Sequence, residues 1–99
     1  PQPPTAIFAA NDIMGAGVLK AAAARGIAVP AQLSVVGFDG SLLTPMLSPS
    51  LTSMMRPVDI MAGAAANRLM DVIEGKEEQL GADSSFHLIV ADSSGPAPG

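Results

Sequence analysis

The sequence contains no cysteine, tryptophan or tyrosine among its 99 residues. The absence of cysteine excludes disulfide bonds and thiolate chemistry and favours a cytosolic setting. Basic residues are scarce too, because five lysines and arginines stand against nine acidic residues. This segment is therefore not expected to bind nucleic-acid phosphates by itself. No apolar run reaches the roughly 20 residues of a membrane span, and the start of the chain has no features of an export signal.

Apolar residues, by contrast, are abundant. Hydrophobic residues make up 48% of the chain and charged residues only 14%, which predicts a folded core over most of its length. The length allows one domain at most. We expect one folded unit over residues 5–94, with residues 1–4 as a disordered lead-in and residues 95–99 as a disordered tail.

The stretch Leu33–Ser41 joins an apolar run to an acidic turn. Val35, Val36 and Phe38 favour a strand that is buried on both faces, as central strands of parallel sheets are. Asp39 ends this strand, at the position where open α/β sheets bind ligands. Its carboxylate could accept hydrogen bonds from a polar ligand, and it is equally compatible with an Asx turn that caps the next segment.

A strand, a helix and the Leu33–Ser41 strand form a predicted β-α-β unit. The first strand covers residues 5–10, and the helix runs from about residue 13 to residue 25, where Gly26 ends it. Such units are right-handed with parallel strands, so Asn11 and Asp39 should lie at the same edge of the sheet. The expected buried face of the helix carries four apolar side chains: Met14, Val18, Ala21 and Ala22. Close packing against the sheet would explain Gly15 and Gly17 within the helix.

The second half of the chain continues the α/β pattern. We expect a loop with one helical turn over residues 42–49, a strand over 51–56, a helix over 58–74, a charged surface turn over 76–79 and a last strand over 86–90. The second helix carries an apolar stripe of Val58, Met61, Ala65, Leu69 and Val72. The predicted class is α/β, a parallel sheet with flanking helices.

Four ordered sequence pieces resemble the lactose- and galactose-repressor family. They are Ala9-Ala10-Asn11-Asp12 with Met14, Gly26 to Pro30, Leu33 to Asp39, and Pro49 to Ser53. The resemblance implies the carboxyl-terminal part of an effector-binding region, whose fold is similar to type I periplasmic sugar-binding proteins. It also implies that the effector is a sugar or a related small molecule, and that DNA is bound only through an amino-terminal helix-turn-helix that is absent here.

In that family the asparagine of Ala-Asn-Asp and the aspartate after Gly-Phe contact the effector, which implies Asn11 and Asp39 as ligand-binding residues here. Asp12 matches the motif as well, and helix capping is the favoured interpretation for it. The chain departs from the family at Gly40, where a second acidic residue is often found, so Ser41 would have to supply the polar contact. It departs again at Ala91, where a basic residue is usual, which puts a salt bridge there in doubt.

The resemblance further implies that residues 51–56 cross between two lobes and that the helix over residues 58–74 packs on a first lobe absent from this chain. Its apolar face would then be exposed in a monomer, so we expect a homo-oligomer with Leu69 buried between chains.

Enzyme functions receive little support from the residues. His87 is the only histidine and has no cysteine beside it, so it is interpreted as structural. Nucleophile elbows and glycine-rich phosphate loops are missing. The sequence therefore predicts no catalytic residue, metal site or cofactor. A sugar-binding protein of an uptake system remains the main alternative to a repressor, and a carboxylate hydrolase using Asp12 and Asp39 comes third.

Overall fold

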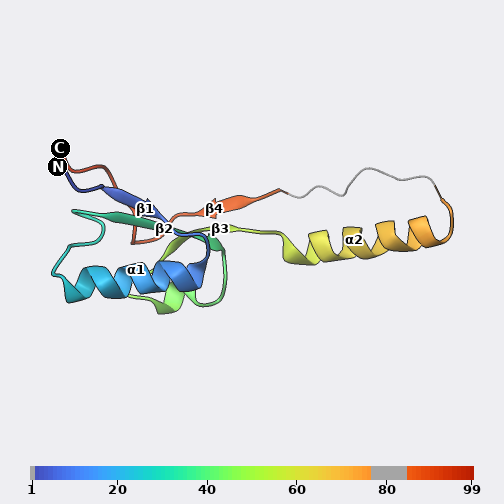
Figure 1. Cartoon of the computed structure of the whole chain (residues 1–99), viewed down its shortest axis with the longest axis horizontal. Helices are drawn as coiled ribbons and strands as arrows, with labels where there is room; N and C mark the ends of the chain where they lie inside the picture. The colour runs from blue at the N-terminus through green and yellow to red at the C-terminus, as the bar shows by residue number, and fades with distance from the viewer. Residues whose placement is uncertain (1, 77–84) are drawn as a thin grey trace. The chain divides into compact units, whose positions relative to one another are not determined.

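The computed structural model describes residues 2–76 and 85–99 and divides the chain into two compact units. The first unit contains the chain up to Met55 together with His87–Gly99, and the second contains Arg56–Phe86. Figure 1 shows the order of elements along the chain.

A four-stranded, mostly parallel sheet forms the first unit. Its strands lie in the order β1 (Ala6–Phe8), β2 (Ser34–Asp39), β3 (Thr52–Met55) and β4 (His87–Ile89). The first three strands are parallel, and β4 pairs with β3 in the antiparallel direction. All four predicted strands are confirmed in place, each somewhat shorter than its apolar segment. The predicted helical turn is also present, as the 3-10 helix η1 (Thr44–Met46).

Helix α1 (Asp12–Ala24) connects β1 with β2. Asn11 is its N-cap, because the Asn11 side chain accepts a hydrogen bond of 2.8 Å from the backbone N–H of Met14. The helix ends before Gly26, whose φ of 67° is the left-handed conformation that the sequence predicts. The interpretation of Asp12 as a cap is wrong, since both of its carboxylate oxygens bind groups outside the helix.

The buried face of α1 agrees in part with the predicted one, because Ala22 is buried and Val18 packs against the core. Gly15, Leu19 and Ala22 face the core, whereas Met14 is 55% exposed and Ala21 is exposed. The helix approaches the sheet most closely at Gly15, which the predicted face left out, because a Cβ atom there would stand 2.7 Å from Leu51 Cδ2. Close packing therefore explains Gly15 and not Gly17, which has open space around it.

The hydrophobic core lies between α1 and one face of the sheet. It is made of Leu19, Ala22, Leu33, Val35 and Leu51. Val35 is fully buried, while Val36 and Phe38 on the other face of β2 are only half-buried. The prediction that β2 is buried on both faces is wrong for this chain. Helix α1 covers one face of the sheet (Figure 1), and the face that carries Val36 and Phe38 is only half-buried.

Ser93, which is fully buried, ties the starts of β2 and β3 together. Its hydroxyl donates to the carbonyl of Val35 at 2.5 Å and accepts from the N–H of Thr52 at 2.8 Å. Thr52 in turn accepts a bond of 2.8 Å from the N–H of Ala91. Gly95 exchanges hydrogen bonds with the Ser34 hydroxyl, and the expected disorder of residues 95–99 stays a prediction.

The second unit contains helix α2 (Val58–Ile73), which ends before Gly75 at a φ of 72°. The predicted helix is confirmed to within one residue. None of its residues is buried, and Leu69 is 60% exposed. Most of the charged turn predicted over residues 76–79 lies outside the described residues. Within the described residues, no helix has the length and apolarity needed to cross a bilayer.

Candidate functional site

The two predicted ligand-binding residues lie at the carboxyl ends of neighbouring parallel strands. Phe8 of β1 pairs with Val36 of β2. From these residues the two strands continue in the same direction, β1 toward Asn11 and β2 toward Asp39. The register therefore places Asn11 and Asp39 at the same edge of the sheet, as the sequence predicts. Ligands of open α/β sheets bind at this edge, and the role of these two residues in binding stays a prediction.

Asn11 can cap α1 and bind a ligand at the same time. Its side-chain oxygen is used by the N–H of Met14, whereas its amide nitrogen carries two further donors. The side chain is half-buried and belongs to the positive end of the helix dipole. A ligand oxygen is the group that would suit this environment.

Asp39 has an unusual backbone conformation. Its φ is 119°, the only positive φ of a non-glycine residue in the described parts of the chain. Such a conformation costs about 1–3 kcal/mol and persists only where the surrounding structure enforces it. Strained residues of this kind cluster at binding sites. Among the residues of this edge, Asp39 therefore has the strongest structural indication of a role in binding.

Asp12 forms a buried hydrogen-bond network beneath the turn after Asp39. It is 2% exposed. One carboxylate oxygen accepts from the Ser41 N–H at 2.8 Å, and the other accepts from the Ser53 hydroxyl at 2.6 Å. The Ser53 oxygen accepts in turn from the Gly40 N–H at 3.0 Å. Asp12 thus joins the start of α1 to the turn after β2 and to β3.

Two glycines allow this close arrangement. A Cβ atom on Gly37 would stand 2.5 Å from Asp12 Oδ1 and 2.9 Å from Leu51 Cδ2. Gly40 has a φ of 64°, and a Cβ atom there would stand 2.6 Å from the backbone Cα of Met55. The space at Gly40 is therefore filled by the neighbouring strand, which gives a structural reason for the absence of an acidic side chain at this position.

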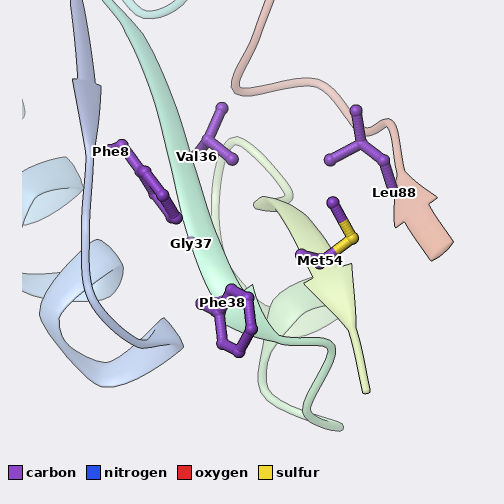
Figure 2. A pocket seen from close by; sticks show the side chains of 6 residues that line it. All are labelled: Phe8, Val36, Gly37, Phe38, Met54 and Leu88. Atoms are coloured by element: carbon purple, nitrogen blue, oxygen red, sulfur yellow. The ribbon is translucent and has the colours of Figure 1, made fainter. Parts of the chain in front are cut away.

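An apolar hollow of about 450 Å³ lies on the sheet face opposite α1 (Figure 2). It is lined by Phe8, Val36, Gly37, Phe38, Met54 and Leu88. The rings of Phe8 and Phe38 lie 6.5 Å apart between centroids, with an angle of 44° between their planes. The apolar residues of β2 predict burial on both faces, so the sequence gives no sign of this hollow.

His87, the only histidine, begins β4 and is exposed. An exposed side chain contributes little to a core, so its interpretation as a structural residue gains no support from packing. Among the described residues, no group of three or more histidine, cysteine or acidic side chains is arranged to hold a metal ion.

The sheet, its flanking helix and the polar edge form an α/β fold, and comparison with known proteins identifies its family. The sequence pattern of the periplasmic binding protein-like domain matches residues 1–93. The probable repressor ExuR of Bacillus subtilis is 36% identical over 96 residues. The chain belongs to the periplasmic binding protein-like domain family, and it is similar to part of LacI-family transcriptional regulators.

Solved structures agree with this assignment. The complex of the transcriptional regulator CelR with cellobiose is 35% identical, with a TM-score of 0.83 over 91% of this chain and 28% of its own. A LacI-family regulator from Lactobacillus casei with bound sucrose is 27% identical, with a TM-score of 0.80 over 92% of this chain and 34% of its own. The alignment with ExuR covers 94% of this chain, which spans 28% of the length of ExuR.

Proposed function

We propose that this chain is the carboxyl-terminal part of the effector-binding region of a cytoplasmic transcriptional repressor, and that its effector is a sugar or a related small molecule. The observation that carries the proposal is the placement of Asn11 and Asp39 at one sheet edge by the pairing of β1 with β2. The sugars bound to the CelR and Lactobacillus casei regulators support the choice of ligand.

The two side chains suit a polyol. A sugar hydroxyl both donates and accepts, so the amide nitrogen of Asn11 can donate to one oxygen while the carboxylate of Asp39 accepts from another hydroxyl. Hydrogen bonds to a charged group are worth about 1.5–3 kcal/mol each. Asp39 therefore supplies the larger share of the affinity on this side of the site.

Binding, with no chemical step, would be the basis of regulation. An effector shifts the protein between two conformations only by as much as it prefers one of them. A separate amino-terminal domain would bind the operator, and this chain would contribute half of the pocket that senses the effector. The isolated chain should consequently bind effector weakly.

The alternatives receive less support. The relatives and structural neighbours named above are transcriptional regulators, which favours a repressor over the sugar-binding protein of an uptake system. Asp12, one half of the carboxylate pair considered for a hydrolase, is 2% exposed and engaged at both oxygens. It is poorly placed to meet a substrate.

Calorimetry on the full-length protein that carries this chain tests the proposal. The protein would be titrated with cellobiose and with sucrose, and its affinity for DNA from upstream of its own gene would be measured with and without each sugar. We expect one site per chain for at least one sugar, and a change in DNA affinity on binding. Sugar binding that leaves DNA affinity unchanged would favour the uptake function instead.

We also propose that the chain forms a homo-oligomer, on account of the uncovered apolar stripe of α2. Val58 and Leu69 are 50% and 60% exposed, and burial of apolar surface is worth about 25 cal/mol per Å². Covering the stripe against a second copy would contribute several kcal/mol to a domain whose net stability is only about 5–15 kcal/mol.

Light scattering at tens of micromolar should therefore give at least a dimer mass for this chain. Leu69→Ser should shift the population toward monomer, because a hydroxyl would replace an apolar side chain at the contact. Asn67→Ser on the same helix is the matched control and should leave the mass unchanged. A monomer mass together with cooperative unfolding would show that the chain covers its own apolar face.

A further inference from the structure

Asp12 lies directly beneath the turn that carries Asp39, and we propose that it is a positioning residue for effector binding. It would hold the turn over residues 39–41 in the conformation that presents the Asp39 carboxylate to the ligand. This inference rests on the proposed function, because it requires Asp39 to bind the effector.

The hydrogen bonds of the turn converge on Asp12. The N–H of Ser41 donates to Asp12 Oδ2 at 2.8 Å, and the N–H of Gly40 donates to the Ser53 hydroxyl at 3.0 Å. That hydroxyl donates its proton to Asp12 Oδ1 at 2.6 Å. Two consecutive backbone donors that follow Asp39 are thus fixed, one by Asp12 itself and the other through Ser53.

The chemistry of this arrangement requires a carboxylate. Every group that faces Asp12 in these bonds is a donor, and an ionised carboxylate is acceptor-only. An asparagine has the same shape but only one acceptor. With its oxygen toward Ser41, its NH₂ group would donate to Ser53, and the Ser53 proton would be left without an acceptor. With its oxygen toward Ser53, its NH₂ group would face the Ser41 N–H, donor against donor.

The turn needs such support because its backbone is strained. Asp39 and Gly40 have consecutive positive φ values of 119° and 64°, and a non-glycine residue leaves this region unless its surroundings enforce it. Gly37 brings the sheet against the carboxylate, since a Cβ atom there would stand 2.5 Å from Asp12 Oδ1. Asp12 is 2% exposed and therefore acts on the effector through the turn.

The test measures cellobiose affinity in the full-length protein for Asp12→Asn, for Asp39→Ala and for the double variant. We expect Asp12→Asn to weaken binding about tenfold, the effect of one lost hydrogen bond. In the Asp39→Ala background the same substitution should leave the remaining affinity unchanged, because the turn no longer carries the carboxylate. A loss of stability alone would not depend on Asp39 in this way.

Two buried serines provide a matched pair of further variants. Ser53→Ala removes the hydroxyl that links Asp12 to Gly40 at the ends of β2 and β3. Ser93→Ala removes a hydroxyl that joins β2 and β3 near their starts. Both should lower the unfolding midpoint. Only Ser53→Ala should weaken cellobiose binding.

The outcomes separate this inference from the proposed function. Loss of affinity in Asp39→Ala without loss in Asp12→Asn overturns the positioning role and leaves the proposed function standing. Unchanged affinity in Asp39→Ala overturns the proposed function and the positioning role with it. Equal losses in Ser53→Ala and Ser93→Ala would show that general destabilisation explains the effect and would also overturn the inference.

Amide hydrogen exchange on this chain gives a second readout that needs no ligand. Asp12→Asn should speed exchange at Gly40 and Ser41 while leaving Val35 and Thr52, which Ser93 holds, as slow as before. Uniform acceleration at all four amides would contradict a specific hold on the turn.

Discussion

Replacing Asp39 by alanine in the full-length protein is expected to weaken effector binding by about 10-fold to 150-fold. The substitution removes a charge-assisted hydrogen bond worth roughly 1.5–3 kcal/mol, which corresponds to that range of affinity. Folding should be spared, because Asp39 is half-buried at the end of β2 and outside the hydrophobic core. Alanine at position 39 would have to adopt the same positive φ, which costs free energy for any residue other than glycine. The unfolding midpoint must therefore be measured alongside the calorimetric affinity.

Asp92→Ala is the matched control for this prediction. Asp92 is an exposed carboxylate whose neighbours Ala91 and Ser93 bind Thr52 at the start of β3, away from the edge that holds Asp39. Its removal changes the net charge by the same amount and should leave effector affinity unchanged. Equal losses in the two variants would mean that overall charge, and not a contact from Asp39, governs binding.

Leu51→Ala is expected to cost about 2–5 kcal/mol of unfolding free energy, the range for deleting a fully buried leucine side chain. Leu51 is 1% exposed and lies against both glycines that bring α1 and β2 together, Gly15 and Gly37. A small domain has a net stability of only about 5–15 kcal/mol, so the variant should be partly unfolded at moderate urea concentrations. Urea denaturation followed by far-UV circular dichroism measures the difference.

Leu42→Ala provides the comparison, because Leu42 is 90% exposed. Its substitution should change the unfolding free energy by no more than about 0.5 kcal/mol, as surface substitutions usually do. Similar urea midpoints for the two variants would contradict the assignment of the core to the α1 side of the sheet.

The sequence was sufficient to predict the order of elements, for reasons that particular residues make clear. Asn11 and Gly26 carry chemistry specific to helix ends, and Val35 lies in an apolar run bounded by turn residues. The face of α1 was predicted less well. Hydrophobic periodicity points to large side chains such as Met14, whereas the actual contact is decided by how closely Gly15 approaches Leu51.

The candidate site was likewise predicted only in part. The shared edge of Asn11 and Asp39 follows from the parallel pairing of successive strands, which a general rule supplies. The hydrogen-bond network joins Asp12 to two residues that are distant in the sequence. Ser41 lies 29 positions after Asp12, and Ser53 lies 41 positions after it. Local patterns carry no information on such pairs. Asp12 therefore looked like a helix cap, which is the commonest use of aspartate before a helix.

The open face of the sheet was missed for a different reason. The apolar side chains of Val36 and Phe38 indicate that this face of β2 is suited to burial. They do not indicate whether the same chain supplies an element that covers the face. In this chain that face carries the hollow of Figure 2. The exposed stripe of α2 was anticipated only because the resemblance to a longer protein implied a missing partner.

Hydrogen–deuterium exchange of the full-length protein, with and without the disaccharide that it binds, tests the central claim most directly. We expect the sugar to slow exchange in the segments after β1 and β2, residues 9–14 and 37–41, and to leave residues 92–95 at the opposite end of the strands unchanged. Protection confined to residues 92–95, or absent from both segments after β1 and β2, would show that the effector does not bind at this edge of the sheet.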